Sequence, residues 1–521
     1  MYRDIMCGRI SSSNEGKKIN LAGWVSKRRD HGQLIFIDLR DKSGIMQIVF
    51  NPEVSQSTHN KSKELRSEWV ISVSGTVKRR IEGAENPDIE TGNYELIVDS
   101  MEILSKSKTP PFEISDANEV SEEIRLKYRF LDLRRDSMQK KMSLRHKVTK
   151  FIWENLSLKG FTHIETPILI KSTPEGARDY VVPSRIKNGS FYALPQSPQQ
   201  MKQMLMVSGC DRYFQIARCF RDEDLRSDRQ PEHTQLDLEM SFVHQEDVME
   251  AVESLYIDLI KDVDNKIVVD SVFEKLSYAE SMDRFGTDKP DLRFEMELKN
   301  LTDIAKNINS NVITNSLASG GVLKGFVAKN SNGYGRKDFD RLTEIVKTQG
   351  AGGLIYISLA ENIDGPINLE DSSGPLNKFY TQENLNDILL KTNAKSGDVI
   401  FMIIGEDKIV NSSLSFLRNH IAEEKNIIDK NIMKFVWITD FPLFEKDAEN
   451  NWQAAHHVFS SPKSDDIEYL EKDPGQVKAD LFDLVCNGVE LGSGSIRIHE
   501  RKLQEKVFDV IGYSKEEVNS L

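Results

Sequence analysis

The first 105 residues carry a succession of short β-prone runs that few folds can accommodate. Three runs, INLAGWVSKRRD, LIFIDLRD and IMQIVF, precede the polar helical stretch STHNKSKELR, and two more, WVISVSGTVKRR and YELIVDSMEIL, follow it. Three strands, one helix and two strands form the element order of an OB-fold barrel. We therefore predict a closed β-barrel in the N-terminal part of the chain.

At 521 residues, the chain is too long for a single ordinary domain. Pro110 and Pro111 mark a linker, because two prolines prevent either neighbouring element from continuing. A helical pattern rich in Lys and Arg follows, and the segment FTHIETPILI, with Pro167, is predicted to be a strand. Apolar strands alternate with helical stretches over 292–405, which indicates a separate α/β block. The fold class is α+β with several domains.

The charge of the chain argues at first against a nucleic-acid partner. Its formal net charge is −13, whereas nucleic-acid-binding surfaces are usually basic. The charge is unevenly distributed, however, because residues 1–110 carry 17 Lys and Arg against 15 Asp and Glu. Widely spaced cysteines, the lack of an apolar run of about 20 residues and the lack of a signal-peptide pattern predict a cytoplasmic protein without a membrane span.

A strand–loop–strand pattern carries the first candidate site. In TQLDLEM, the polar residues Gln235, Asp237 and Glu239 alternate with apolar ones, so that they share one face of a strand. Arg221 ends the preceding strand. Such a face suits a zwitterionic or phosphorylated ligand, although alternation alone is more typical of a solvent-exposed hairpin face.

Two further segments could bind an anion or a cation. In LPQSPQQMKQ, Ser197, Gln199 and Lys202 would lie around the first turn of a helix, where free N–H groups and a cation favour a carboxylate. The alternative there is an ordinary serine cap. In DLVCNGVELGSGSIRIH, Asp483 and Glu490 could hold Mg²⁺ together with substrate phosphates. The alternative here is a glycine hairpin.

Taken together, these segments resemble one family. FRDEDLRSDRQPEHTQLDLE is similar to the second signature motif of class II aminoacyl-tRNA synthetases, in the form found in aspartyl-tRNA synthetases. TPEGARDYVVPSR, ALPQSPQQMKQ, GTDKPDLRF and NGVELGSGSIRIH also match in order and spacing. FTHIETPIL resembles the first motif, and GWVSKRRDHGQLIFIDLRD resembles the anticodon-binding module. The resemblance implies an ATP-dependent aspartate–tRNA ligase of the bacterial type that forms homodimers.

The resemblance also implies how the chain is divided. An OB-fold anticodon-binding domain would span 1–107 and a hinge 108–135. The catalytic domain, an antiparallel β-sheet flanked by helices, would be split between 136–291 and 406–521. A bacterial insertion domain would occupy 292–405.

For ATP, the resemblance implies contacts around the second motif. Arg221 would bind the α-phosphate and the reacting carboxylate, and His233 would stack on adenine. The residues implied to contact ATP are Arg221, Asp222, Glu223, Gln230, His233 and Glu490, and those implied to hold Mg²⁺ are Asp483 and Glu490. Arg221, Glu223 and Glu490 form the implied catalytic set. The reaction would need no protein nucleophile, because aspartate itself attacks ATP.

For L-aspartate, the resemblance implies that both ends of the amino acid are recognised. The implied binding residues are Glu175, Ser197, Gln199, Lys202, Arg221, Asp237, His456 and Arg497. Asp237 would hold the α-ammonium group, and Arg497 with Lys202 would bind the side-chain carboxylate. A guanidinium only donates hydrogen bonds, so the amide of asparagine would place donors against donors. The pair His456–His457 lacks the second ligand motif that a metal site needs.

For tRNA, the resemblance implies contacts on the barrel. The implied anticodon-binding residues are Arg28, Arg29, Phe36 and Gln47. Phe36 would stack on a base, and the alternative is that it belongs to the barrel core. His31 and Gly83 look like the branch of the family that also charges the asparagine tRNA.

The chain departs from the family at its C-terminal end. The third class II motif, a Gly-rich strand and helix whose arginine packs on adenine, is not found before Leu521. We expect a synthetase truncated before this motif. The alternatives are a non-catalytic tRNA-binding or regulatory protein, which the otherwise complete pocket disfavours, and a related enzyme for asparagine or lysine. Arg497 and the insertion disfavour the latter.

Overall fold

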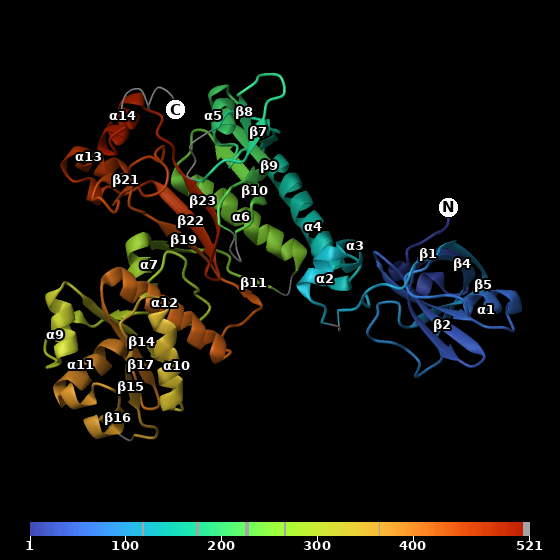
Figure 1. Cartoon of the computed structure of the whole chain (residues 1–521), viewed down its shortest axis with the longest axis horizontal. Helices are drawn as coiled ribbons and strands as arrows, with labels where there is room; N and C mark the ends of the chain where they lie inside the picture. The colour runs from blue at the N-terminus through green and yellow to red at the C-terminus, as the bar shows by residue number, and fades with distance from the viewer. Residues whose placement is uncertain (117–118, 173–176, 225–228, 265–266, 364, 514–521) are drawn as a thin grey trace. The chain divides into compact units, whose positions relative to one another are not determined.

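The computed structural model describes residues 1–116, 119–172, 177–224, 229–264, 267–363 and 365–513 (Figure 1). The chain forms two compact units, Met1–Lys147 and Val148–Leu521. Among the described residues, no helix has both the length and the apolar character that crossing a membrane would require.

The N-terminal unit contains a closed five-stranded barrel, which confirms the predicted OB fold. Its strands close in the order β1-β2-β3-β5-β4, with helix α1 (Gln56–Ser62) between β3 and β4 in the chain. The strands are β1 (Lys18–His31), β2 (Leu34–Asp41), β3 (Gly44–Phe50), β4 (Val70–Arg79) and β5 (Tyr94–Ser105). Strand β2 shows the alternation of a barrel wall. Ile35, Ile37 and Leu39 are fully buried inside the barrel, and the residues between them face outward.

The segment between the barrel and the long helix α4 (Asp136–Leu158) is more structured than a proline-rich linker suggests. It contains two short helices, α2 (Glu122–Lys127) and α3 (Arg129–Asp132). Ion pairs connect Arg134 and Arg135, which follow α3, to Glu68 of the barrel and to Asp116, and Asp116 accepts a hydrogen bond from Ser137 at the start of α4.

The C-terminal unit contains two sheets formed by the segments predicted to be catalytic. One sheet has the order β10-β9-β6 and another the order β12-β19-β22-β23. The strands are β6 (Thr162–His163), β9 (Arg212–Phe220), β10 (Glu232–Met240), β12 (Glu274–Ser277), β19 (Phe435–Thr439), β22 (Leu481–Cys486) and β23 (Val489–Ser495). Most pairs are antiparallel, but β6–β9 and β12–β19 are parallel. Helix α6 (Gln245–Val263) packs against both sheets, through Leu255 on one and Met249 on the other.

The strand predicted for FTHIETPILI is largely wrong. Only Thr162 and His163 pair with a neighbouring strand, and an isolated bridge follows at Ile170. Pro167 lies between them and cannot donate a ladder hydrogen bond. The remaining catalytic elements are α5 (Gln199–Val207), α7 (Tyr278–Phe285), α13 (Tyr469–Lys472), α14 (Arg501–Val510), β7 (Val181–Pro183), β8 (Phe191–Ala193), β11 (Val268–Val269), β18 (Ile432–Met433), β20 (Phe444–Lys446) and β21 (Trp452–Ala454).

The inserted α/β block is built on a five-stranded sheet of order β13-β14-β17-β15-β16. Its strands are β13 (Lys299–Asn300), β14 (Val322–Ala328), β15 (Ile355–Leu359), β16 (Ser372–Ser373) and β17 (Val399–Gly405). Its helices are α8 (Thr302–Ala305), α9 (Asn311–Ala318), α10 (Arg336–Lys347) and α11 (Gln382–Thr392). Helix α12 (Asp407–Glu424) shares a hydrophobic cluster with α10 on one face of this sheet, while α9 and α11 cover the other (Figure 1). The packed block therefore extends past residue 405.

Arg418 of α12 is fully buried and connects α12 to residues 291–296, where the inserted block begins. Its guanidinium donates hydrogen bonds to the backbone carbonyls of Asp291, Phe294, Glu295 and Met296, at 2.7–3.2 Å. It also lies over the ring of Phe294, at 4.1 Å. Burial lowers the pKa of Arg418 to about 10, so the side chain stays charged at neutral pH.

We expect the substitution Arg418→Met to lower the free energy of unfolding by about 3 kcal/mol or more, because several buried carbonyls lose their donor. Urea unfolding followed by circular dichroism measures this change. The matched control is Arg336→Met at the exposed start of α10, which should stay within about 0.5 kcal/mol of the parent. Equal effects of the two substitutions would contradict the structural role of Arg418.

Candidate active site

The polar face of β10 is the centre of the candidate site. Asp237 lies opposite Gln215 of β9, and Glu239 lies opposite Tyr213. The Tyr213 hydroxyl donates a hydrogen bond to Gln215, at 2.8 Å. Asp237 is only 4% exposed. The alternative of a solvent-exposed hairpin face is therefore wrong for this carboxylate.

Helix α5 brings a buried cation to this face. The ammonium group of Lys202 lies 2.7 Å from Asp237 and 3.1 Å from Glu239. From β23's C-terminal side, Arg497 reaches Glu239 at 3.5 Å. Lys202, Asp237 and Arg497, each predicted from a separate segment, are thus brought together. Glu239 links the two cations. The alternation of β10 places it on the candidate polar face, but it is not among the residues that the resemblance implies for aspartate binding.

Three buried polar atoms of this cluster have no hydrogen-bond partner among the described residues. They are Oδ2 of Asp237, Nε2 of Gln199 and Nε of Arg497. Buried polar groups are almost always paired, so each unpaired one calls for a bound partner. One acceptor and two donors suit a small ligand that carries both an ammonium group and a carboxylate.

Gln196 holds Ala177 and Asp179 of the TPEGARDYVVPSR loop. Its side chain accepts a hydrogen bond from the Ala177 N–H at 3.0 Å and donates to Asp179 at 2.6 Å. Sequence reasoning missed Gln196, although it lies inside the LPQSPQQMKQ segment. Ser197 next to it is half-buried. Glu175, predicted to act in the same loop, lies outside the described residues.

Arg221 lies directly after β9, at the mouth of the loop that leads to β10. Its backbone N–H donates to the carbonyl of Pro231, at 2.9 Å, and this bond closes the base of the loop. Burial and the nearby guanidinium of Arg221 lower the pKa of His233. The two residues implied to contact ATP phosphate and adenine therefore lie near one another.

The other predicted ATP contacts in this loop already have partners or are exposed. Glu223 pairs with Arg229 at 2.8 Å. The backbone N–H of Asp222 donates to the carbonyl of Arg178, at 3.0 Å. Gln230 is exposed. Glu223 therefore has to exchange its partner if it is to face ATP.

Asp483 and Glu490 lie on the neighbouring strands β22 and β23. Burial, opposed by a hydrogen bond to Ser493, raises the pKa of Asp483 to about 7, and its Oδ1 has no hydrogen-bond partner. Glu490 pairs with Lys289 of the GTDKPDLRF segment, at 2.8 Å. Within the described ranges, no group of three His, Cys, Asp or Glu side chains could by itself hold a metal ion.

The two histidines of the HH pair pack against aromatic rings. His456 makes an edge contact with Phe441, with ring centroids 5.0 Å apart, and His457 stacks on Phe459. The guanidinium of Arg497 also lies over the ring of Phe459, at 4.6 Å. These contacts fix the plane of Arg497 rather than form a metal site.

The outer face of the barrel presents the predicted anticodon-binding residues. Phe36 lies opposite Arg29 of β1 and is only partly buried, so the alternative that it belongs to the barrel core is wrong. Arg29 forms a bidentate pair with Asp38 at 2.7 and 2.8 Å and also donates to Gln47 at 3.2 Å. Gln47 in turn donates to Glu95, at 2.9 Å. Asp38 and Glu95, which sequence reasoning missed, orient these polar groups beside an accessible ring.

The remaining barrel predictions lie nearby or in a turn. His31 makes an edge contact with Phe36, with ring centroids 5.6 Å apart. Arg28 pairs with Asp30 at 2.8 Å. Gly83 has φ of +86°, a conformation that favours glycine, and its N–H donates to Glu85. The structure thus joins His31 to the predicted stacking platform.

Comparisons with known proteins agree with this geometry. Residues 121–521 match the family of class II tRNA synthetases (D, K and N), and residues 19–104 match an OB-fold nucleic acid binding domain. An aspartate–tRNA(Asp/Asn) ligase of Caldanaerobacter subterraneus is 50% identical over 99% of this chain and 86% of its own length. An aspartate–tRNA ligase of Staphylococcus carnosus is 48% identical over 99% of this chain and 87% of its own length. These matches do not establish the expected truncation, which stays a prediction.

Two solved structures share the fold. An asparaginyl-tRNA synthetase from Pyrococcus horikoshii, complexed with asparaginyl-adenylate, has a TM-score of 0.58 and 17% identity and covers 100% of this chain and 89% of its own. An aspartyl-tRNA synthetase from Entamoeba histolytica has a TM-score of 0.56 and 16% identity and covers 98% and 81%. The match over residues 121–521 and the relatives that are about half identical show that the chain belongs to the class II tRNA synthetases of the D, K and N group.

Proposed function

We propose that this protein activates L-aspartate with ATP and transfers the aspartyl group to tRNA, as an aspartate–tRNA ligase. The observation that carries the proposal is the buried cluster of Lys202, Asp237 and Arg497, whose unpaired acceptor and donor match an amino acid with a second carboxylate. The relatives that are about half identical over nearly the whole chain support the same substrate.

In the proposed complex, the free Oδ2 of Asp237 accepts a hydrogen bond from the α-ammonium group of aspartate. The Nε of Arg497 donates to the side-chain carboxylate, and Lys202 adds positive charge. Gln199 supplies a further donor. Lys202 and Asp237 neutralise one another before aspartate binds, which avoids the cost of an isolated buried charge.

In the proposed first step, the α-carboxylate of aspartate attacks the α-phosphorus of ATP and pyrophosphate leaves. Arg221 binds the α-phosphate and the attacking carboxylate and stabilises the negative charge that develops. His233 packs on the adenine. The terminal hydroxyl of tRNA then attacks the aspartyl carbonyl, and AMP leaves. Positioning and charge stabilisation therefore carry the chemistry.

Asp483 and Glu490 fit a hard divalent cation. Asp483 offers a buried oxygen without a partner among the described residues. Burial and, to a lesser extent, the neighbouring carboxylates raise its pKa, so a cation would be stabilised there. When bound, Mg²⁺ would neutralise part of the charge of the ATP phosphates. Lys289 has to release Glu490 for the carboxylate to become a ligand.

For the barrel, we propose that Phe36 stacks on an anticodon base. The substitution Phe36→Ala is expected to weaken tRNA binding by about 1–3 kcal/mol, which is roughly 5- to 150-fold in KM for tRNA. Aspartate-dependent exchange of pyrophosphate into ATP should stay unchanged. Phe36→Tyr, which keeps a stacking ring, should remain close to the parent; equal losses in both variants would contradict stacking.

We also propose that the enzyme charges both aspartate and asparagine tRNAs. His31 lies against the predicted stacking ring, and several relatives carry the name aspartate–tRNA(Asp/Asn) ligase. Charging assays on the two tRNAs test this directly. Strict selectivity for the aspartate tRNA would overturn the proposal.

A homodimer in the cytoplasm is the proposed working form. The β7–β8 hairpin exposes Val181 and Phe191 by more than half of their surfaces, and a second copy of the chain could cover such apolar residues. None of the four cysteines forms a disulfide, which suits a reducing compartment. Sedimentation equilibrium determines the oligomeric state.

Aspartate-dependent ATP–pyrophosphate exchange is the test of the proposed function. We expect exchange with aspartate and little with asparagine or lysine. Binding of tRNA without any exchange would instead support a non-catalytic tRNA-binding protein.

A further inference from the structure

Glu68 is a buried carboxylate that joins the barrel to the segment following it. It is 3% exposed and adopts φ of +65°, just before β4. Arg40 of β2 donates to both of its oxygens at 2.8 Å. Arg134, directly after α3, donates to the same carboxylate at 2.7 Å. One acidic group therefore holds one arginine from the barrel and one from the hinge.

Arg134 has a second contact on the barrel. Its guanidinium lies over the ring of Trp24 in β1, at 5.2 Å. Its side chain is 30% exposed, whereas that of Glu68 is 2% exposed. The carboxylate of Glu68 is thus shielded from solvent, and salt weakens an ion pair less when one of its groups is buried. We call Trp24, Arg40, Glu68 and Arg134 the hinge pin.

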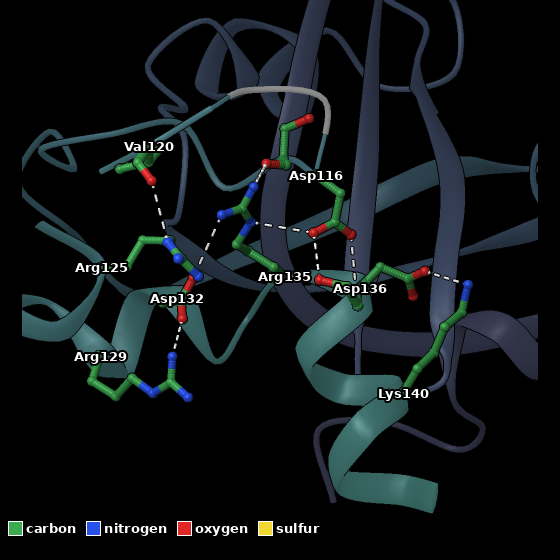
Figure 2. Close-up of polar contacts among 10 residues, drawn as sticks. Asp116, Val120, Arg125, Arg129, Asp132, Arg135, Asp136 and Lys140 are labelled. Atoms are coloured by element: carbon green, nitrogen blue, oxygen red, sulfur yellow. Dashed lines mark hydrogen bonds and ion pairs between the residues drawn. The ribbon is translucent and has the colours of Figure 1, made fainter. Parts of the chain in front are cut away.

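A second set of contacts continues from α3 to the start of α4 (Figure 2). Asp132 is fully buried, accepts a hydrogen bond from Arg129 and pairs with Arg135 at 3.6 Å. Arg135 also pairs with Asp116 at 3.2 Å. Asp116 accepts hydrogen bonds from the N–H and the hydroxyl of Ser137, at 2.9 and 2.6 Å, in the first turn of α4.

These contacts form a continuous path from the barrel to α4. Arg134 pairs with Glu68 of the barrel, while its neighbour Arg135 pairs with Asp132, the last residue of α3, and with Asp116. The barrel, α3 and the first turns of α4 belong to one compact unit. These contacts therefore connect the barrel, the end of α3 and the start of α4 within this unit.

We propose that Glu68 is a positioning residue for tRNA charging, which rests on the proposed function. By fixing the barrel on the first turn of α4, the hinge pin sets the direction in which bound tRNA leaves the barrel. A reacting group that is displaced by even a small distance loses about 100-fold in rate. Aspartate activation does not involve the barrel, so it should not depend on the pin.

The test compares Glu68→Gln, Arg134→Met and the double variant in the full chain. Glu64→Gln is the matched control, because Glu64 is an exposed barrel carboxylate at 3.9 Å from Lys106. Three quantities are measured: aspartate-dependent pyrophosphate exchange, charging of full-length aspartate tRNA, and binding of the isolated anticodon stem–loop.

We expect kcat/KM for charging to fall about tenfold in each single variant. Because the two residues act as a pair, kcat/KM of the double variant should not fall below that of the less active single variant. Exchange and stem–loop binding should stay within about twofold of the parent, and Glu64→Gln should match the parent in all three. Unchanged charging, or stem–loop binding that falls in proportion to charging, would overturn the inference. A parent without aspartate-dependent exchange would overturn the proposed function instead.

Discussion

Replacing Arg221 by glutamine is expected to lower aspartate-dependent pyrophosphate exchange by about 10³-fold. Arg221 directly follows strand β9, and the hydrogen bond from its backbone N–H to the carbonyl of Pro231 closes the base of the loop. In the proposed reaction, negative charge develops on the α-phosphate, and loss of one positioned donor to such charge costs about 10²–10³-fold. An arginine that stabilises a phosphoryl-transfer transition state contributes up to about 10⁵-fold.

The loss should appear mainly in kcat, because the interaction strengthens in the transition state. Arg218→Gln is the matched control: Arg218 lies on strand β9 before Arg221, is half exposed and pairs with Glu232, at 2.7 Å. It should keep exchange within about twofold of the parent. A loss confined to KM for ATP in Arg221→Gln would show that Arg221 merely binds the ground state.

The alternation of apolar and polar residues along the sequence predicts those strands in which one face is buried and the other faces solvent or a site. The alternation in β2 predicts a barrel wall because Ile35 and Ile37 point inward and Phe36 points outward. The same period places Asp237 and Glu239 on one face of β10. A strand pair with a short connecting loop needs no distant partner to define its faces, so the sequence suffices.

Contacts between distant segments cannot be derived from such patterns. The pairing of Lys202 with Asp237 joins residues 35 positions apart, and that of Arg134 with Glu68 joins residues 66 apart. The local pattern thus predicted that Lys202 and Asp237 each contact substrate, whereas in the folded chain the two side chains pair with one another. Pro167 and its neighbours show the converse, because a β-prone segment forms a strand only where a partner strand is available.

The carboxylate-recognition end of the pocket depends on how Arg497 is held. Nη1 donates to the hydroxyl of Ser495 at 2.8 Å, Nη2 reaches Glu239 at 3.5 Å, and the guanidinium plane lies over Phe459. Nε remains buried without a partner among the described residues. The side chain is therefore fixed before substrate binds, and one donor is left for a carboxylate oxygen.

The substitution Arg497→Met should lower kcat/KM for aspartate by about 10⁴-fold, because a pocket that hydrogen-bonds its substrate discriminates by about 10⁴–10⁵-fold. Exchange with asparagine should hardly change, since asparagine never gained from the guanidinium. Arg497→Lys keeps the charge but loses the fork geometry and should lie between the two. Arg501→Met, at a highly exposed position four residues further on, is the control. Equal losses with both amino acids would show that Arg497 supports the fold of the pocket and does not select aspartate.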